Sequence, residues 1–253
     1  MIRSFHIISA FSATLLFGLG AIAASSFEPT PDARPDILDR YFEASKTQTE
    51  KMRGLQMEMD VDAKLPKLNK QGKLHAMRFV SKLGKITFNV LSFVGDNTIK
   101  KEVIARYLQA EQEANDKSDN MAITEKNYKF KHKKQVQLNS RVISIFEVTP
   151  REKRVGLFKG EIWIDNETSM PVRESGRFVK NPSVFFKKVE FVREYEIKEG
   201  LSLPSAVKSY ADVRIAGRVE LDINFSHYSP RDAKLDIDDE AIASNTPSSP
   251  AQD

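Results

Sequence analysis

The sequence predicts an α+β protein in which a curled antiparallel sheet, an unclosed half-barrel, carries about two helices over its concave face. Most of the chain has apolar residues at every second position, two segments have them at helical spacing, and turn residues separate the alternating segments. With 253 residues, 40% of them apolar, the chain is long enough for one sizeable core.

The composition excludes several classes of function. Cysteine is absent, which removes disulfides, thiolate metal sites and cysteine nucleophiles. The 39 Lys and Arg residues exceed the 35 Asp and Glu residues by only four, whereas nucleic-acid binders carry a clustered basic excess. The sequence contains neither a Gly-x-Ser-x-Gly elbow nor a glycine-rich phosphate loop. We therefore expect no nucleic-acid partner, no cofactor and no enzymatic activity.

Residues 1–24 are predicted to be a secretory signal peptide. Arg3 supplies its positive start, an uncharged apolar run follows, and the small residues around Ala23 and Ala24 form a cleavage site. The alternative is a membrane anchor, because the apolar run is close to the ~17-residue lower limit for spanning a bilayer. Cleavage near Ala23/Ala24 predicts export to the periplasm.

The exported part is expected to hold one domain over residues 25–229. Residues 230–253 are rich in acidic and small residues and contain Pro247 and Pro250, so they are predicted to form a flexible acidic tail.

Two helices are predicted, at Pro35–Arg53 and Thr98–Asn115. In the second, Ile99, Val103 and Tyr107 share an apolar face, while Asp96 to Thr98 supply cap residues for its start.

The strands are predicted from alternation with period two, in which one face is apolar and the other polar. By these criteria we expect roughly ten strands, mostly in a meander. The clearest segments are Leu55–Asp62, Ile86–Phe93, Lys126–Lys134, Val142–Val148, Leu157–Asp165, Val172–Val179, Phe185–Ile197, Ala206–Val213 and Arg218–Phe225. Turn residues separate them at Leu83-Gly84, Asp165-Asn166, Asn181-Pro182, Glu199-Gly200 and Ala216-Gly217.

The predicted helices are too few to cover such a sheet. Strands at ~4.8 Å spacing make it about 45–50 Å wide, and two helices of ~10 Å cover less than half of that. A sheet of this size tends to curl, and a curled sheet filled incompletely by helices leaves an apolar cleft.

This arrangement resembles the LolA-like lipoprotein-sorting proteins of the bacterial envelope. The two share the order of their elements: a leader, a long amphipathic helix, strands, an inserted helix and a strand meander. The most similar stretch is Gly160–Arg173, in which a strand ends in an Asp-containing turn and resumes at Pro171. The resemblance implies an unclosed barrel with a helical lid and an apolar cavity for acyl chains. In contrast to the founding carriers, this chain has a single tryptophan, Trp163, and no early tryptophan-rich strand.

The candidate cavity residues are apolar side chains on the predicted concave face. They are Leu55, Met57, Met59, Val61, Phe88, Val90, Ile162, Ile164, Phe185, Val189, Phe191, Leu221 and Ile223. Ile99, Val103 and Tyr107 are the corresponding residues of the lid helix.

Two features are candidates for surface contact. One is the lysine-rich strand, in which Lys129, Lys131 and Lys133 lie on one face. These lysines either contact anionic lipid headgroups transiently or keep a sheet edge from pairing with another strand. We favour the second interpretation. Trp163 is out of phase with Ile162 and Ile164, so it either contacts a membrane or partner or lies beneath a loop.

These features predict a periplasmic, non-enzymatic protein that holds an acyl chain of a lipid or lipoprotein, with transport to the outer membrane as its purpose. The alternative is an envelope sensor that binds a protein partner with the same fold. A hydrolase would need His75, His132 or His227 to converge with acidic side chains, and none of the three lies in a ligand-spaced motif, so no metal site is expected. The oligomeric state is left open.

Overall fold

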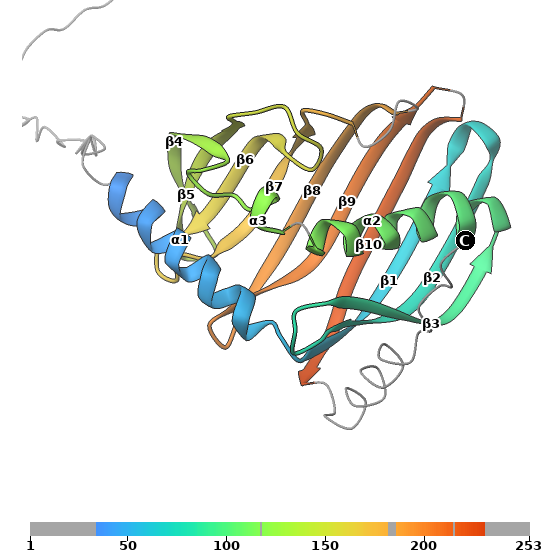
Figure 1. The fold of residues 1–253 in the computed structure, drawn as a ribbon, viewed down its shortest axis with the longest axis horizontal. Coiled ribbons are helices and arrows are strands. Elements are labelled where there is room, and N and C mark those ends of the chain that lie inside the picture. The colour runs from blue at the N-terminus through green and yellow to red at the C-terminus, as the bar shows by residue number, and fades with distance from the viewer. Residues whose placement is uncertain (1–33, 117, 182–185, 215, 231–253) are drawn as a thin grey trace, which may run out of the picture. The chain divides into compact units, whose positions relative to one another are not determined.

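A computed structural model describes residues 34–116, 118–181, 186–214 and 216–230 (Figure 1). The predicted signal peptide, the tail beyond residue 230 and Phe185 lie outside the described residues. Within the described part, none of the helices is both long and apolar enough to span a bilayer.

Helices and strands follow the predicted order. The helical segments are α1 Arg34–Lys51, the short 3-10 turn η1 Pro66–Leu68, the π-helical segment η2 Ile99–Ile104, α2 Ala105–Asp116 and α3 Ser118–Met121. The strands are β1 Leu55–Leu65, β2 Lys70–Val80, β3 Ile86–Gly95, β4 Tyr128–Leu138, β5 Arg141–Pro150, β6 Phe158–Asp165, β7 Pro171–Phe178, β8 Phe186–Lys198, β9 Leu201–Val213 and β10 Gly217–Pro230.

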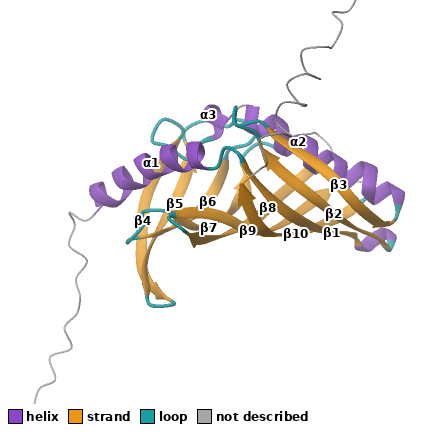
Figure 2. Ribbon diagram, turned by 90° about the horizontal axis from the view of Figure 1, so that it is seen from below, coloured by secondary structure: helices purple, strands orange, loops and turns teal. Residues whose placement is uncertain are grey.

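All ten described strands belong to one antiparallel sheet in the order β3-β2-β1-β10-β9-β8-β7-β6-β5-β4. Each strand pairs with the strand that follows it in the sequence, except that β3 does not pair with β4. In addition, the first strand, β1, pairs with the last, β10, and Val61 lies opposite Ile223. β3 and β4 are the two edges, so the sheet is not closed. This confirms the predicted fold class, a curled and unclosed antiparallel sheet with helices on one face (Figure 2).

The strand order explains why a helix lies across the sheet. β3 and β4 are consecutive in the sequence but occupy opposite edges, so the chain between them must cross the whole sheet. That connection carries η2, α2 and α3, and Figure 2 shows them with α1 on the same face. The connection between the two edges therefore covers part of the concave face, and α1, which precedes β1, covers another part.

The second helix begins differently from the prediction, because its first turn, η2, is π-helical. Ile99 and Ile104 are both fully buried in η2 although they are five residues apart. An α-helix, with 3.6 residues per turn, would place them on different sides, whereas the i→i+5 bonding of a π-helix brings them together.

Asp96 caps the start of this helix, as predicted. Its Oδ1 accepts the backbone N–H of Thr98 at 2.7 Å, and Lys70 Nζ donates to the same oxygen at 3.3 Å. Hydrogen bonds from Thr98, with a further contribution from Lys70, lower the pKa of Asp96 below its ordinary value of 3.8.

We predict that this cap makes stability depend on pH. Because the folded-state pKa is lowered, the contribution of Asp96 is complete above its unfolded-state pKa and is lost as the pH falls through the folded-state value. Asp96→Asn keeps the oxygen acceptor and removes the titration. The difference in unfolding free energy between the parent and this variant should therefore shrink between about pH 5 and pH 3 in urea titrations. A difference that stays constant over this range would contradict the assignment.

β4 is an edge strand, as the favoured interpretation of its lysines predicts. Tyr128 and Phe130 turn inward, while Lys129 and Lys131 are exposed on the opposite face. A bulge follows His132 in the pairing with β5. Exposed lysines keep a sheet edge from pairing with another chain.

Candidate functional site

Two large hydrophobic clusters and a smaller one, formed by Met57, Val80 and Ile86, lie between the helices and the sheet. One large cluster lies beneath η2 and contains Met59, Val61 and Ile223, and the other lies beneath α1, where Tyr41 packs over Phe158 and Ile162. Charged and phenolic side chains line two cavities beside these clusters. They are Arg78, Tyr107, Glu111, Glu174, Arg193 and Tyr195.

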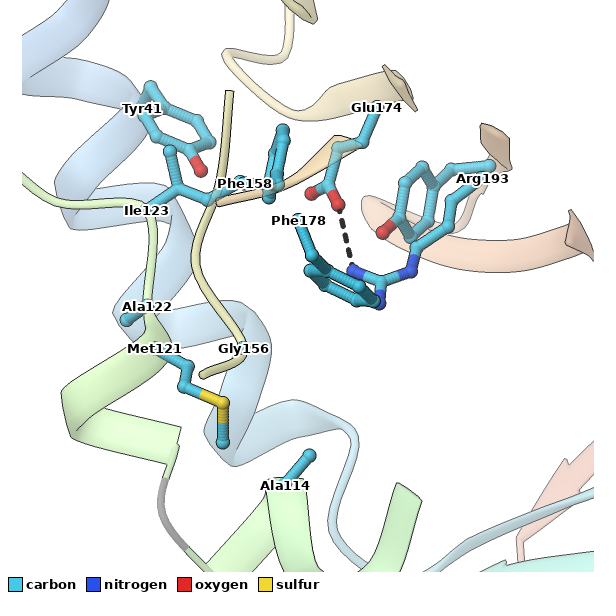
Figure 3. Close-up of a pocket in the computed structure, with 11 residues that line it drawn as sticks. Tyr41, Ala114, Met121, Ala122, Ile123, Gly156, Phe158, Glu174, Phe178 and Arg193 are labelled. Atoms are coloured by element: carbon cyan, nitrogen blue, oxygen red, sulfur yellow. Dashed lines mark hydrogen bonds and ion pairs between the residues drawn. The ribbon is translucent and has the colours of Figure 1, made fainter. Parts of the chain in front are cut away.

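The first cavity lies beside α1 and has a volume of about 350 Å³ (Figure 3). Apolar side chains form most of its wall, including Met121, Ile123, Phe158 and Phe178. Its polar wall residues are Tyr41, Glu174, Arg193 and Tyr195.

The second cavity, of about 280 Å³, lies beneath α2. Ile86, Val207 and Phe225 are among its apolar wall residues. Ala114, Arg193 and Tyr195 line both cavities, so the two adjoin at these residues. The space between the helices and the sheet thus holds two adjoining cavities, and their walls are more polar than those of the apolar cleft that the sequence predicted.

Arg193 and Glu174 form an ion pair at the junction, with Nη1 and Oε2 3.3 Å apart. Glu174 is buried, whereas 42% of the Arg193 side chain remains accessible because the guanidinium borders both cavities. The guanidinium also lies over the ring of Phe191, 4.6 Å from its centroid. Burial opposes the charge, but Tyr195 and Glu174 outweigh it and raise the pKa of Arg193, so the guanidinium stays protonated.

The tyrosines of the site are hydrogen-bond donors at all ordinary pH values. Burial raises the pKa of Tyr41 and Tyr195, and the negative charge of Glu174 adds to the effect. Burial likewise raises the pKa of Tyr107, next to Glu111. These phenols therefore remain neutral and present O–H groups to the site.

A second ion pair joins the sheet to the helix across the other cavity. Arg78 Nε lies 2.8 Å from Glu111 Oε1, and Arg78 is buried on the concave face of β2. The other carboxylate oxygen of Glu111 is buried and has no hydrogen-bond partner in the described part of the chain. The second cavity thus offers both a charged donor, Arg193, and an unpaired acceptor, Glu111 Oε2, to a polar group.

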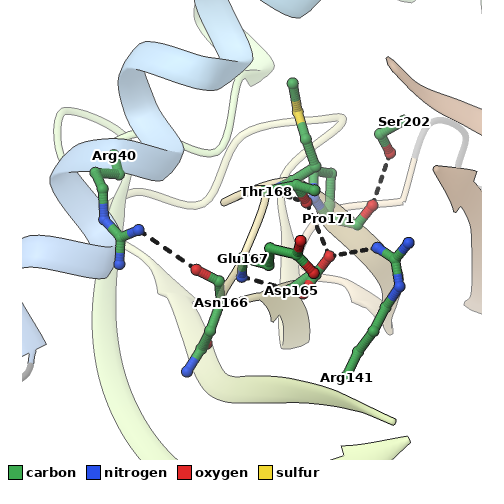
Figure 4. Close-up of polar contacts among 9 residues, drawn as sticks. Arg40, Arg141, Asp165, Asn166, Glu167, Thr168, Pro171 and Ser202 are labelled. Carbon is green, nitrogen blue, oxygen red and sulfur yellow. Dashed lines mark hydrogen bonds and ion pairs between the residues drawn. The ribbon is translucent and has the colours of Figure 1, made fainter. Parts of the chain in front are cut away.

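The helix α1 is held to the sheet by a few polar contacts at each end. Gln48 accepts the N–H of Ser202 at 3.1 Å and donates to its carbonyl oxygen at 2.6 Å. Ser202 Oγ in turn donates to the carbonyl of Pro171 at 2.7 Å. Near the start of α1, Arg40 donates to the carbonyl of Asn166 at 3.4 Å (Figure 4).

The turn that receives these contacts is organised by Asp165, which is fully buried. Its carboxylate accepts hydrogen bonds from Arg141 at 2.6 Å, from the Thr168 hydroxyl at 3.0 Å and from the N–H of Glu167 at 3.2 Å (Figure 4). β6 ends at Asp165 and β7 begins at Pro171, as the Gly160–Arg173 stretch predicted. Here that stretch anchors the helix rather than lining a cavity.

Most predicted cavity residues lie in the packed core. Of the predicted cavity and lid residues that the structure describes, only Tyr107 lines either cavity. The buried members are Met57, Met59, Val61, Ile99, Ile162, Ile164, Val189, Phe191, Leu221 and Ile223. Leu55, Phe88 and Val103 are partly buried, and Val90 on the edge strand is exposed.

The sequence pattern did not predict the polar residues of the site, Arg193, Tyr195 and Glu174. The alternation along the strand does place Arg193 and Tyr195 on the same face as Val189 and Phe191, which indicates that they point toward the interior. Glu174 has no such signal, since its neighbours in β7 do not alternate cleanly.

The candidate surface residues lie on the opposite face of the sheet or at its edge. Lys129 and Lys131 are exposed, and Lys133 is 3.7 Å from Glu147. Trp163 is partly buried: its Nε1 donates to Glu161 at 3.2 Å, and Arg173 lies 5.5 Å from its ring centroid. In the described part of the chain, Arg173 of the neighbouring strand packs against it.

The histidines are dispersed. His75 lies 2.9 Å from Asp60, and His227 lies 3.0 Å from Glu58, while His132 packs edge-on against Phe146. No group of three or more metal-ligating side chains occurs among the described residues.

No known protein family and no curated protein matches the sequence. Among solved structures, a LolA superfamily protein from Nitrosomonas europaea aligns over 77% of this chain and 94% of its own, with 9% identity and a TM-score of 0.39. An outer membrane lipoprotein-sorting domain from Vibrio parahaemolyticus aligns over 81% and 97%, with 11% identity and a TM-score of 0.43. The MucA/MucB complex from Pseudomonas aeruginosa aligns over 77% and 100%, with 11% identity and a TM-score of 0.25.

LolA-like proteins, the family that the sequence resembles, are thus among the solved structures that align with this chain. At these identities and TM-scores, the similarity assigns neither a ligand nor a functional residue to this chain.

Proposed function

We propose that this protein binds the acyl chain of a lipid or lipoprotein, without a covalent step, between its helices and the concave face of its sheet. The observation that carries this proposal is the pair of adjoining cavities, of about 350 and 280 Å³, that meet at Ala114, Arg193 and Tyr195. Pockets of roughly 300–1,000 Å³ with apolar walls and a few convergent polar groups are typical ligand sites.

Both parts of an amphiphilic ligand find suitable partners in this space. Methylene groups buried against Phe158, Phe178 and Phe225 contribute ~0.8 kcal/mol each. An ester, amide or headgroup at the junction accepts hydrogen bonds from Arg193 and from the neutral phenol of Tyr195, so its polar atoms are not buried unpaired.

Release requires the helices to move away from the sheet. At its C-terminal end, α1 is held by the paired hydrogen bonds between Gln48 and Ser202, and at its start by the long Arg40 contact to Asn166. Such contacts between partly exposed groups contribute about 0.5–1.5 kcal/mol each, so α1 is the element we expect to open.

The cellular setting is part of the same proposal. The predicted signal peptide supports export to the periplasm, where a carrier shields acyl chains from water on the way to the outer membrane. The acyl chain itself, not a cofactor, is the expected partner.

Ala114→Phe is expected to reduce the amount of lipid that co-purifies with the protein. The ring would occupy the junction of both cavities and displace at least two methylene groups, about 1.6 kcal/mol of burial, which corresponds to roughly tenfold weaker binding. The measurement is mass spectrometry of organic extracts from protein purified without detergent from its native envelope. Ala110→Phe makes the same change at another exposed alanine of α2, one that lines neither cavity, and as the control it should keep the parent amount.

Lipid-free protein in all three preparations would contradict the proposal. In that case, crosslinking in cells tests the alternative, a sensor that binds a protein partner: one stoichiometric partner that survives lipid extraction would favour it.

A further inference from the structure

The two edges of the sheet differ in their protection. β4 carries several exposed lysines, which block pairing with another strand. Each of the two edge strands contains one bulge, so the difference between them lies in their charge. β3 has the sequence Ile-Thr-Phe-Asn-Val-Leu-Ser-Phe-Val-Gly, without a charge or a proline. The first charges lie just outside it, at Lys85 and Asp96.

β3 also exposes apolar side chains and free backbone groups. Val90, Leu91 and Val94 are 46%, 52% and 74% exposed. Gln112 of α2 donates to the carbonyl of Ile86 at 3.2 Å. Among the described residues, no element other than β2 forms a hydrogen bond with residues 88–94. An edge strand of this kind is a template for a further strand.

We propose that β3 pairs antiparallel with β3 of a second copy of this chain, which joins the two sheets about a two-fold axis. The axis passes between Val90 and Leu91. In this register Lys85 of each copy lies opposite Asp96 of the other, so that each end of the ribbon pairs opposite charges. Phe88 lies opposite Phe93, and Asn89 lies opposite Ser92.

The bulge in β3 makes this register possible. Directly opposed residues must point to the same face, yet Phe88 and Phe93 are five positions apart and would point to opposite faces in a regular strand. The pairing with β2 slips by one residue between Val90 and Ser92, and Phe88 and Phe93 both pack against the hydrophobic cluster beneath η2. Because of this slip, the side chains of opposed residues in the two copies point to the same face of the joined sheet on both sides of the axis.

The same asymmetry of edges limits the assembly. A two-fold interface uses the same patch on both copies and closes on itself. Because the other edge of each copy, β4, is protected by lysines, the expected assembly ends at the dimer and does not extend into a fibre.

Sedimentation of the full mature chain tests the assembly. We expect a concentration-dependent equilibrium between one and two copies. Val94→Lys places a charge on an exposed edge position opposite Thr87 and should raise the dissociation constant about tenfold or more. Leu138→Lys introduces the same charge at an exposed apolar position on the other edge, β4, and should leave the equilibrium unchanged.

The absence of cysteine allows a direct test of register. A mixture of Asn89→Cys and Ser92→Cys chains should form a disulfide-linked dimer under mild oxidation, because opposed Cβ atoms are about 4.5–5.5 Å apart. Neither variant alone has opposed thiols, so each should crosslink far more slowly.

Equal crosslinking in the mixture and in the single variants would overturn the register and with it the proposal. A single-copy species at all concentrations would also overturn it. In that case, protection of β3 amides from hydrogen exchange would show that another segment of the same chain covers the edge.

Discussion

Asp165→Ala is expected to lower the free energy of unfolding by roughly 2–4 kcal/mol. The carboxylate is fully buried and accepts hydrogen bonds from Arg141, Thr168 and Glu167, so its removal leaves several donors of the β6–β7 turn without an acceptor. Hydrogen bonds to charged groups contribute about 1.5–3 kcal/mol, and neutral ones about 0.5–1.5 kcal/mol.

Urea titration followed by circular dichroism measures this loss. Asp165→Asn keeps the shape and one oxygen acceptor, so it should lose less than half as much as the alanine variant. The alanine variant should also release α1, because Asn166 and Pro171 on the same turn hold Arg40 and Ser202. An alanine variant within about 0.5 kcal/mol of the parent would refute this role of Asp165.

Glu174→Ala is expected to cost roughly 2–4 kcal/mol and to alter the binding site at the same time. It leaves Arg193 charged beneath the helices without its partner, 3.3 Å away in the parent. Removal of one member of a buried ion pair costs about 3–5 kcal/mol, and the value is smaller here because Arg193 borders the cavities. The measurement is the free energy of unfolding from urea titrations.

Two comparisons separate the effect of the pair from that of its location. The double variant Glu174→Leu with Arg193→Met replaces the pair by apolar side chains of similar size and should recover most of the stability. Glu194→Ala breaks the pair between Glu194 and Arg173, where both side chains are partly exposed, and should cost less than about 1 kcal/mol. A double variant as unstable as Glu174→Ala would show that the pair itself is not the cause.

The double variant also bears on the proposed function. It keeps the volume of the junction but removes the charged donor, Arg193. If a polar group of the ligand lies there, this variant should fold like the parent and retain less lipid, so stability and binding separate.

Sequence alone determined the local elements of this protein. Alternation with period two predicted nine of the strands, and helical spacing predicted α1 and the helix after β3, because both patterns depend only on neighbouring residues. β2 was not delimited, since Arg78 occupies its buried face and Gly72 lies near its start. The lysines of β4 predicted an edge strand, and this pattern too depends only on residues close together in the sequence.

Only the tertiary structure decided what lies between the layers. The pairing of β1 with β10 makes β3 and β4 the two edges, and thereby sends the connecting helix across the concave face. Glu174 and Arg193 are acceptable in the interior because neighbouring strands bring them together, and Arg78 because it meets Glu111 from the helix. Burial of a charge depends on a partner supplied by another element, and no pattern of spacing along the chain encodes that partner.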